Sequence, residues 1–323
     1  MLKEAAVFRT KLCDILKIDY PIIQGGMVWI CMHELAAAVS EAGGLGVLAG
    51  GSMTSEELAE EIRLTKAATK KPFGVNIPLL RPDAETLIDV TIAGGAAAVV
   101  SSAGNPKRFT KKIQDAGLKV IHVSPNVGLA AKAGEAGVDA VVGEGIEAGG
   151  HDGFDEITTM ALIPQLVERL TVPVIAAGGI ADGRGFVAAL ALGAQGVQMG
   201  TRFAATFEAR AHPKFKEAIL SVNDTGTIVS ARTLGPTRAV KNKLTERIAE
   251  AERACVPKEQ LLDLIGEGRS RMASVDGEVE EGTVYCGQIG GLIKDLKHAG
   301  DVVRETIEEA ERLVKELGEA AKR

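Results

Sequence analysis

Eight short apolar runs alternate with helix-like patterns between residue 21 and about residue 205, and this alternation restricts the fold more than any other feature. Each run is followed by glycine or polar residues. Short buried strands that alternate with helices are typical of parallel βαβ units. The predicted strands are 21–24, 45–49, 73–76, 97–101, 118–123, 138–142, 172–176 and 196–199.

Eight such units predict a closed (β/α)8 barrel rather than an open sheet. An open doubly wound sheet is the alternative, because a sequence does not show whether the first and last strands pair. Glycine and polar residues follow nearly every predicted strand, however, and not only one or two of them. A ring of loops around one mouth needs this arrangement, and barrel active sites lie at the mouth formed by the carboxyl ends of the strands.

The alternation stops near residue 205. We therefore expect residues 1–205 to form the barrel and residues 206–323 to form a helical appendage that packs on it and is not an independent domain. Residues 303–321 carry apolar side chains at the spacing of an amphipathic helix. We expect this last helix to pack on the barrel or on a second subunit, and we expect a homodimer.

Composition and charge exclude several classes of function. The formal net charge of -6 argues against nucleic-acid binding, which needs a basic surface. No apolar run reaches the roughly 18 residues of a membrane-spanning helix, so no membrane association is expected. The N-terminus shows no secretory signal, and neither the cysteines nor the histidines have the sequence spacing of metal ligands. We expect a cytoplasmic protein without a metal site.

One histidine lies in a glycine-rich stretch directly after the sixth predicted strand. Five glycines surround His151 in residues 143–153, and Glu144 and Glu147 lie in the same stretch. Glycines at the end of a strand let the backbone approach a ligand closely, and a histidine gains or loses a proton near neutral pH. His151 is therefore the candidate catalytic residue. The alternative is a glycine-rich turn with an incidental histidine.

The seventh and eighth predicted strands end in further glycine turns. Gly178 and Gly179 follow the seventh strand, and Gly200 and Thr201 follow the eighth. Both turns precede a predicted helix, so backbone N–H groups and helix N-termini converge there and can bind a phosphate group. Barrels often bind phosphate at these two loops. We predict a phosphate site, with tight turns that bind no ligand as the alternative.

Residues after the first and third strands suit a flat heteroaromatic ring. Gly26 permits close backbone approach, Met27 places a thioether beside it, and Asn76 offers a donor and an acceptor to a ring amide. One phosphate and one ring together point to flavin mononucleotide (FMN). Taken singly, Met27 is equally explained as a core residue and Asn76 as a strand-end turn residue.

The motifs around these residues form one set: PIIQGGMVW (21–29), KPFGVNIPLL (71–80), EGIEAGGHDG (144–153), PVIAAGGIADGRG (173–185) and QMGTRF (198–203). This set resembles the nitronate monooxygenase/2-nitropropane dioxygenase superfamily. Within it the sequence looks most like the flavin-dependent enoyl-acyl-carrier-protein reductases of type II. QGGM followed by tryptophan and the helical tail favour that branch.

The resemblance implies a TIM barrel that binds FMN non-covalently, with NADH or NADPH as co-substrate. By position, Gly26 and Met27 would lie against the ring and Asn76 would bind its polar edge. Glu144 would contact the flavin, and His151 matches the active-site histidine of the family. The residues carried over to the phosphate are Gly178, Gly179, Gly200 and Thr201.

These expectations lead to one leading hypothesis and two alternatives. The leading hypothesis is an FMN-dependent enoyl-acyl-carrier-protein reductase of fatty-acid synthesis, which passes hydride from NAD(P)H through FMN to a 2-enoyl thioester. His151 would supply the proton for the α-carbon. The first alternative is a nitronate monooxygenase, in which the same histidine serves a small nitronate and O2 reoxidises the flavin. The second is a non-catalytic FMN-binding barrel.

A basic stretch in the predicted appendage is a candidate contact for the carrier protein. Residues 225–245 contain no acidic side chain but several basic ones. A docking patch for an acidic carrier, or for a phosphate-bearing ligand, is one explanation. A solvated loop, or arginines paired with carboxylates elsewhere, is the other. The basic residues are Arg232, Arg238, Lys241 and Lys243.

Overall fold

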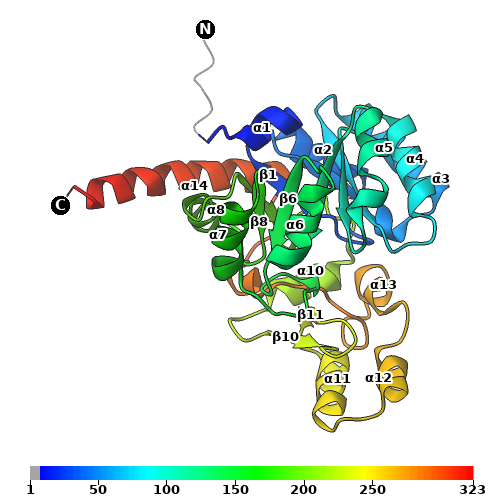
Figure 1. Cartoon of the computed structure of the whole chain (residues 1–323). Helices are drawn as coiled ribbons and strands as arrows, with labels where there is room; N and C mark the ends of the chain where they lie inside the picture. The colour runs from blue at the N-terminus through cyan, green and yellow to red at the C-terminus, as the bar shows by residue number, and fades with distance from the viewer. Residues whose placement is uncertain (1–7, 323) are drawn as a thin grey trace.

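Eight parallel strands form a nearly closed barrel at the centre of the molecule (Figure 1), which confirms the predicted (β/α)8 architecture. The strands are β1 (Ile22–Gln24), β2 (Gly46–Ala49), β3 (Phe73–Pro78), β4 (Ala98–Ser102), β5 (Lys119–Ser124), β6 (Ala140–Glu144), β8 (Val174–Ala177) and β9 (Gly196–Met199). They neighbour one another in the order β1-β9-β8-β6-β5-β4-β3-β2. A bridge between Ile23 and Leu45 joins the two ends of this order. The computed structural model describes residues 8–322.

Apolar side chains fill the barrel from the end at which its strands begin. Leu45, Val100 and Ile175 belong to one buried cluster inside the barrel. Leu12 of the short helix α1 (Lys11–Leu16) joins this cluster and packs against Gly196 at the start of β9. Because this end is plugged, a ligand has access only from the end at which the strands finish.

Helices cover the outside of the barrel (Figure 1). One of them, α3, begins at a capping box in which the Thr54 hydroxyl accepts a hydrogen bond from the Glu57 N–H and the Glu57 carboxylate accepts one from the Thr54 N–H. No helix of residues 8–322 is long and apolar enough to cross a membrane. The outer helices are α2 (His33–Glu41), α3 (Ser55–Ala68), α4 (Ala84–Gly94), α5 (Thr110–Asp115), α6 (Val127–Glu135), α7 (Thr159–Arg169) and α8 (Gly183–Ala191), with 3-10 turns η1 (Gly50–Ser52) and η2 (Pro106–Arg108).

A long insertion follows β9 and lies below the barrel in the view of Figure 1. It contains the predicted helices and also two strands that the sequence pattern did not predict. The second of these strands pairs both with the first and with β7 (Gly150–His151), so the strand that carries His151 joins the insertion rather than the barrel. The elements of this part are α9 (Thr201–Ala204), α10 (Pro213–Leu220), β10 (Thr227–Ser230), β11 (Thr237–Val240), α11 (Lys243–Arg253), α12 (Lys258–Ile265), α13 (Arg269–Ser274) and η3 (Gln288–Leu292).

The final helix, α14 (Ala299–Ala320), returns to the barrel and packs against α8 and α2. It therefore takes the place of the eighth outer helix. Its first half buries Val303, Ile307 and Ala310, whereas Val314 and Leu317 are exposed where the helix projects beyond the barrel. The division of the chain into a barrel (1–205) and an appendage (206–323) stays a prediction.

Candidate active site

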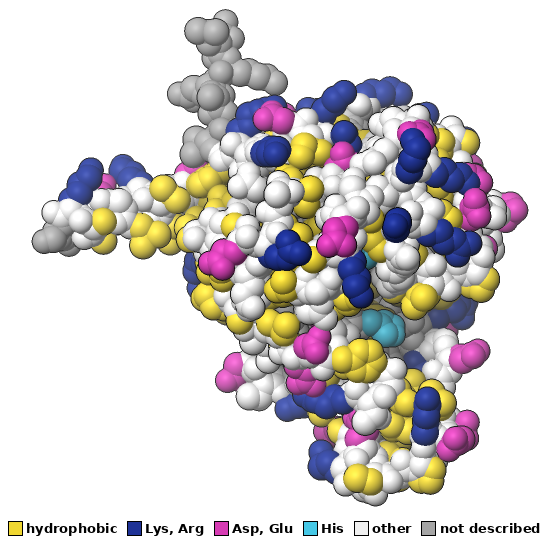
Figure 2. Space-filling view, in the orientation of Figure 1, with side chains coloured by type: hydrophobic (Ala, Val, Ile, Leu, Met, Phe, Trp, Pro, Cys, Tyr) yellow, Lys and Arg dark blue, Asp and Glu magenta, His cyan; other side chains and the backbone are white. Residues whose placement is uncertain are grey.

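A cavity of about 1400 Å³ opens at the carboxyl ends of the barrel strands. Its wall includes the loops that follow the strands and, from the insertion, Tyr285 and Gly287. Figure 2 shows the molecule hollowed between the barrel and the insertion, with histidine and hydrophobic side chains at the edge of the hollow. The structure brings all the predicted site residues to this cavity. They are Gly26, Met27, Asn76, Glu144, His151, Gly178, Gly179, Gly200 and Thr201.

His151 is held at the cavity by contacts with the insertion. It pairs with Thr237 of β11, and the N–H of the next residue, Asp152, donates to the Pro236 carbonyl at 2.8 Å. The ring of Tyr285 lies 5.7 Å from the imidazole, centroid to centroid. The side chain has free surface toward the cavity, but the surrounding protein desolvates it and lowers the pKa of the imidazole. A neutral imidazole at neutral pH can accept a proton.

Two carboxyl groups in the cavity wall hold protons near neutral pH. Burial raises the pKa of Glu144, at the end of β6, to about 7. Burial and the charge of Glu144 together raise the pKa of Asp152 to about 8, against the opposing effect of Arg238. Both carboxylate oxygens of Asp152 are buried and have no hydrogen-bond partner among residues 8–322. Asp152 lies within the EGIEAGGHDG motif (144–153), but the sequence did not indicate that its carboxyl group would be buried.

Glu147, the other acidic residue of the glycine-rich stretch, is engaged in holding the loops together. Its carboxylate accepts hydrogen bonds from the N–H of Thr159 at 2.9 Å and from the Thr159 hydroxyl at 3.1 Å, at the start of α7. The same hydroxyl lies 3.1 Å from the Ala177 carbonyl and 3.0 Å from the Gly178 carbonyl. Glu147 thus joins the loop after β6 to the loop after β8.

The two turns predicted to bind phosphate differ in what their glycines do. Gly178 and Gly179 have φ angles of +92° and +72°, which favour glycine. A Cβ at Gly178 would lie 2.8 Å from the Gly145 carbonyl oxygen, whereas a Cβ at Gly200 would face open space, 3.8 Å from the Met27 sulfur. Of Gly178 and Gly200, only Gly200 leaves space for a ligand by lacking a side chain.

Thr201 has a contact that leaves its hydroxyl proton free. Its Oγ1 accepts a hydrogen bond from the Gly287 N–H at 2.9 Å. An oxygen that accepts from a backbone N–H keeps its own proton for another acceptor. Thr201, at the start of α9, can therefore donate to a phosphate.

The ring site has an orphaned acceptor that sequence reasoning missed. A Cβ at Gly26 would lie 2.4 Å from the Asn76 Cβ, so only glycine fits there. The Asn76 amide donates to the Val100 carbonyl at 3.0 Å, which leaves the Asn76 oxygen for a ligand. The Gln198 Oε1 is buried and has no hydrogen-bond partner in the part of the chain that the structure describes. The side-chain oxygens of Asn76 and Gln198 can accept hydrogen bonds from the N–H groups of a ring. The space at Gly200 can hold a phosphate group. In the sequence, the only indication of this role is that Gln198 is a polar residue in an otherwise apolar predicted strand.

The basic stretch does not form one patch. Arg238 is buried and donates to the Ile146 carbonyl at 2.9 Å. Arg232 forms an ion pair with Glu156 at 2.8 Å. Lys241 and Lys243 are exposed and do not line the cavity. Arg232 thus follows the alternative of an arginine paired with a carboxylate, whereas Arg238 serves a contact with the backbone.

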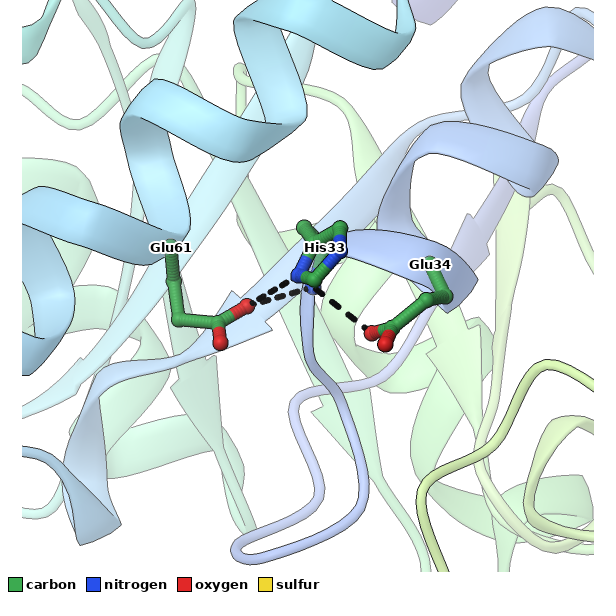
Figure 3. Close-up of side chains that lie close together, drawn as sticks. All are labelled: His33, Glu34 and Glu61. Atoms are coloured by element: carbon green, nitrogen blue, oxygen red, sulfur yellow. Dashed lines mark hydrogen bonds and ion pairs between the residues drawn. The ribbon is translucent and has the colours of Figure 1, made fainter.

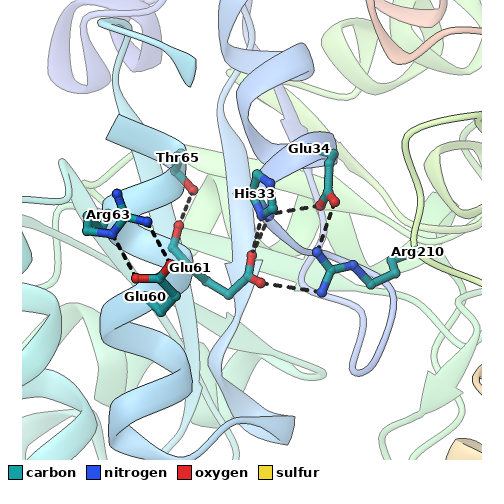
Figure 4. A network of polar contacts seen from close by, with 7 residues as sticks. All are labelled: His33, Glu34, Glu60, Glu61, Arg63, Thr65 and Arg210. Carbon is teal, nitrogen blue, oxygen red and sulfur yellow. Dashed lines mark hydrogen bonds and ion pairs between the residues drawn. The ribbon is translucent and has the colours of Figure 1, made fainter. Parts of the chain in front are cut away.

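A second cluster of titratable groups lies outside the cavity, where α2 and α3 meet the insertion (Figure 3). The His33 Nδ1 lies 2.8 Å from Glu61 and 3.4 Å from Glu34, and the three side chains place ligand atoms within 4.8 Å of one another. Sequence spacing does not reveal this group, because Glu61 comes from a different helix. Arg210 of the insertion lies 2.9 Å from Glu34 and 3.4 Å from Glu61 (Figure 4). Its guanidinium already supplies the cation that these carboxylates need, so the cluster joins the insertion to the barrel.

His122 of β5 is buried and hydrogen-bonded. Its Nδ1 lies 2.8 Å from the Ser101 hydroxyl, and burial lowers its pKa to about 4. It also lines the inner cavity. A neutral His122 adds no charge to the site.

Comparisons with known proteins agree on one family. A family model described as nitronate monooxygenase matches residues 9–309. A (3aS,4S,5R,7aS)-5-hydroxy-7a-methyl-1-oxo-octahydro-1H-indene-4-carboxyl-CoA dehydrogenase of Mycobacterium tuberculosis is 31% identical over 94% of this chain and 96% of its own. A probable nitronate monooxygenase of Staphylococcus saprophyticus is 30% identical over 94% of this chain and 98% of its own.

Solved structures give the same result. FabK from Thermotoga maritima is 40% identical, with a TM-score of 0.92 over 97% of this chain and 99% of that chain. A nitroalkane oxidase from Streptomyces ansochromogenes is 27% identical, with a TM-score of 0.80 over 94% of this chain and 99% of that chain. The similarity in both cases extends over the barrel and the insertion together.

Proposed function

The chain belongs to the nitronate monooxygenase family of flavin-dependent oxidoreductase enzymes, and on this premise we propose that it is an FMN-dependent enoyl-acyl-carrier-protein reductase that uses NADH or NADPH. An acyl carrier protein would present the 2-enoyl thioester. A cytoplasmic location and a homodimer belong to the same proposal. The family assignment makes the chain an enzyme and so excludes the non-catalytic barrel.

The observation that carries this proposal is the apolar rim of the cavity. Leu80, Leu129 and Phe154 line the cavity that contains His151, and their side chains are 77%, 46% and 67% exposed. Large apolar side chains left exposed around a pocket are typical of sites for apolar ligands. An acyl thioester would cover this rim, whereas a small nitronate would leave it in water. The similarity to FabK and to a carboxyl-CoA dehydrogenase supports the same substrate class.

The cavity residues would divide the binding of FMN among them. Gly26 and Met27 would lie against the ring, and Asn76 and Glu144 would contact its polar edge together with Gln198. Bound FMN would supply hydride transfer from NAD(P)H to the β-carbon of the thioester. The residues that would bind the phosphate are Gly178, Gly179, Gly200 and Thr201.

His151 would give a proton to the α-carbon of the substrate. Its lowered pKa makes the imidazolium a stronger acid once formed, although a smaller fraction is protonated at neutral pH. Glu144 and Asp152 add protonated carboxyl groups to the same wall. The proposed site would therefore have three groups able to hold a proton in the wall of one cavity.

One observation favours the alternative of a nitronate monooxygenase. A histidine with a lowered pKa is largely neutral at neutral pH, and a neutral imidazole is the form that a general base needs. In this alternative His151 would take a proton from a nitroalkane or stabilise a bound nitronate. The name of the family model describes the same activity.

Anaerobic stopped-flow spectroscopy distinguishes the two activities. The flavin of the purified protein is reduced with NADH or NADPH, and crotonyl thioester or a nitronate is then added. The proposal expects rapid reoxidation by the thioester without O2. Reduction of the oxidised flavin by a nitronate, with reoxidation by O2 but not by the thioester, would favour the alternative, and a protein that binds no FMN would contradict both.

A further inference from the structure

The cavity continues outward past His151, along the surface between η2 and α6. Its outer wall includes Lys107 of η2 and three residues of α6, namely Leu129, Lys132 and Glu135. The three α6 residues are three positions apart, so they share one face of the helix. At a rise of about 1.5 Å per residue, Lys132 lies roughly 7.5 Å along the helix from its start at Val127. We call this outer part the α6 groove.

The two lysines of the α6 groove have no acidic partner within residues 8–322. Lys107 and Lys132 are exposed and form no ion pair, whereas the neighbouring Lys111, Lys112 and Lys119 each pair with a carboxylate. Unpaired ammonium groups beside a cavity are available to an anionic ligand.

Two acidic groups of the cavity wall reduce this positive charge only in part. Asp155 accepts a hydrogen bond from the Asn126 amide at 2.7 Å, which satisfies one of its oxygens. Glu135 lies one turn beyond Lys132 on α6. On α6 the apolar Leu129 therefore lies one turn nearer the start of the helix than the unpaired Lys132, and Lys107 lines the same cavity from η2.

We propose that the α6 groove binds the phosphopantetheine arm of the thioester substrate, with Lys107 and Lys132 binding its phosphate. This inference rests on the proposed reductase function, because that function requires a thioester in the cavity. The arm is a flexible chain with a thioester at one end and a phosphate at the other. Along α6 the groove offers the same order, from the apolar Leu129 near the start of the helix to the exposed cation of Lys132.

The test uses the flavin-loaded enzyme and the variant K107Q/K132Q. One substrate, crotonyl-CoA, carries the phosphopantetheine arm, and the other, crotonyl N-acetylcysteamine thioester, lacks the phosphate. We expect the KM for crotonyl-CoA to rise about tenfold, the change that corresponds to roughly 1.4 kcal/mol. The KM for the truncated thioester, the KM for NAD(P)H and kcat should stay unchanged. Added salt should raise the wild-type KM for crotonyl-CoA more than that of the variant.

Two further variants control for charge. K11Q/K258Q removes two exposed lysines that do not line the cavity and should leave every KM unchanged. K107R/K132R keeps the charges and should keep the low KM for crotonyl-CoA. An equal rise for both thioesters would overturn the proposal, and so would a rise in the KM for NAD(P)H alone, which would assign the groove to the dinucleotide phosphate. A rise seen instead with K241Q/K243Q would move the docking site to the insertion.

A binding measurement separates this inference from the reductase proposal. Calorimetry compares 4′-phosphopantetheine with pantetheine on the flavin-loaded wild type and on K107Q/K132Q. Tighter binding of the phosphorylated compound, lost in the variant, would support the groove even if the enzyme reduced no enoyl thioester. Equal binding of the two compounds to the wild type would overturn the proposal whatever the activity.

Discussion

Gly178 and Gly200 both border the proposed phosphate site, yet the absence of a side chain serves a different purpose in each. At Gly178 the backbone adopts a positive φ and packs closely on the Gly145 carbonyl. At Gly200 the missing side chain leaves space inside the cavity. Glycine is therefore needed at position 178 for the fold and at position 200 for binding a ligand in the cavity.

Substitutions at these two glycines should therefore separate folding from cofactor binding. We expect Gly200→Val to lose FMN binding while the flavin-stripped protein keeps its free energy of unfolding within about 0.5 kcal/mol. We expect Gly178→Ala to destabilise the flavin-stripped protein by about 1–3 kcal/mol, because of its φ and the close carbonyl. Flavin fluorescence after gel filtration and urea unfolding measure the two effects. A Gly200→Val protein that retains FMN would show that the phosphate lies elsewhere.

His151→Ala tests the proton donor directly. The variant should bind FMN and accept hydride from NAD(P)H at the wild-type rate, but reoxidation by the enoyl thioester should slow on the order of a hundredfold, as expected for loss of one general acid. Stopped-flow absorbance of the flavin follows both half-reactions. If the second half-reaction is unchanged, His151 has no catalytic role in it.

Glu144 gives the protein a pH-dependent stability with a definite sign. Its folded pKa of about 7 lies above the ordinary value of 4.5, so the folded state binds the proton more tightly than the unfolded state does. Stability from this group is therefore present below pH 4.5, falls as the pH rises to 7, and is constant above that. Relative to wild type, Glu144→Gln should gain up to about 3 kcal/mol between pH 5 and pH 8. Urea unfolding of the flavin-stripped proteins measures this, and a difference independent of pH would contradict it.

At the scale of elements, the insertion is tied to the barrel at several points, and Arg202 provides one of them. This buried arginine of α9 donates to the Asp295 carboxylate at 2.9 Å and to the carbonyls of Ala205 and Asp295 at 2.7 Å. Asp295 lies in the segment that leads back to α14. The contact therefore holds the segment that follows η3 against α9, which begins with Thr201.

Replacing Arg202 should cost more than replacing an exposed arginine. We expect Arg202→Met to lower the free energy of unfolding by about 2–4 kcal/mol, because two carbonyls lose their donor. Arg184→Met, which breaks an exposed pair with Asp182, is the control and should cost less than about 1 kcal/mol. Urea unfolding compares the two variants. Equal losses would mean that the buried contacts of Arg202 add no stability.

The sequence revealed the elements whose pattern is local and missed those that depend on distant partners. Apolar runs followed by glycine predicted the barrel strands, and the glycine turns brought His151, Gly200 and the other predicted residues to one mouth. β7 has only two residues and pairs with β11, so no period could reveal it. The burial of the Asp152 carboxyl and the unpaired oxygen of Gln198 depend in the same way on how distant segments pack.

At the scale of the whole molecule, α14 completes the barrel although it follows the insertion. Its buried half packs on α8 and α2, and its projecting half has few neighbours. We expect Ile307→Ala to lower the free energy of unfolding by about 2–4 kcal/mol, because it opens a cavity at this contact. Leu317→Ala, on the projecting half, is the control and should change stability by less than about 0.5 kcal/mol. Thermal or urea unfolding measures both, and equal effects would contradict the role of α14 as an outer helix.

The position of α14 also determines when the outer layer of the barrel can be completed during translation. The last barrel strand, β9, leaves the ribosome before the insertion does. The last outer helix, α14, leaves it only after the whole insertion has been synthesised. Until then the seam between α8 and α2 is uncovered, and the apolar surface that Val303 and Ile307 later bury faces water. Docking of α14 is consequently the step that ends this exposure.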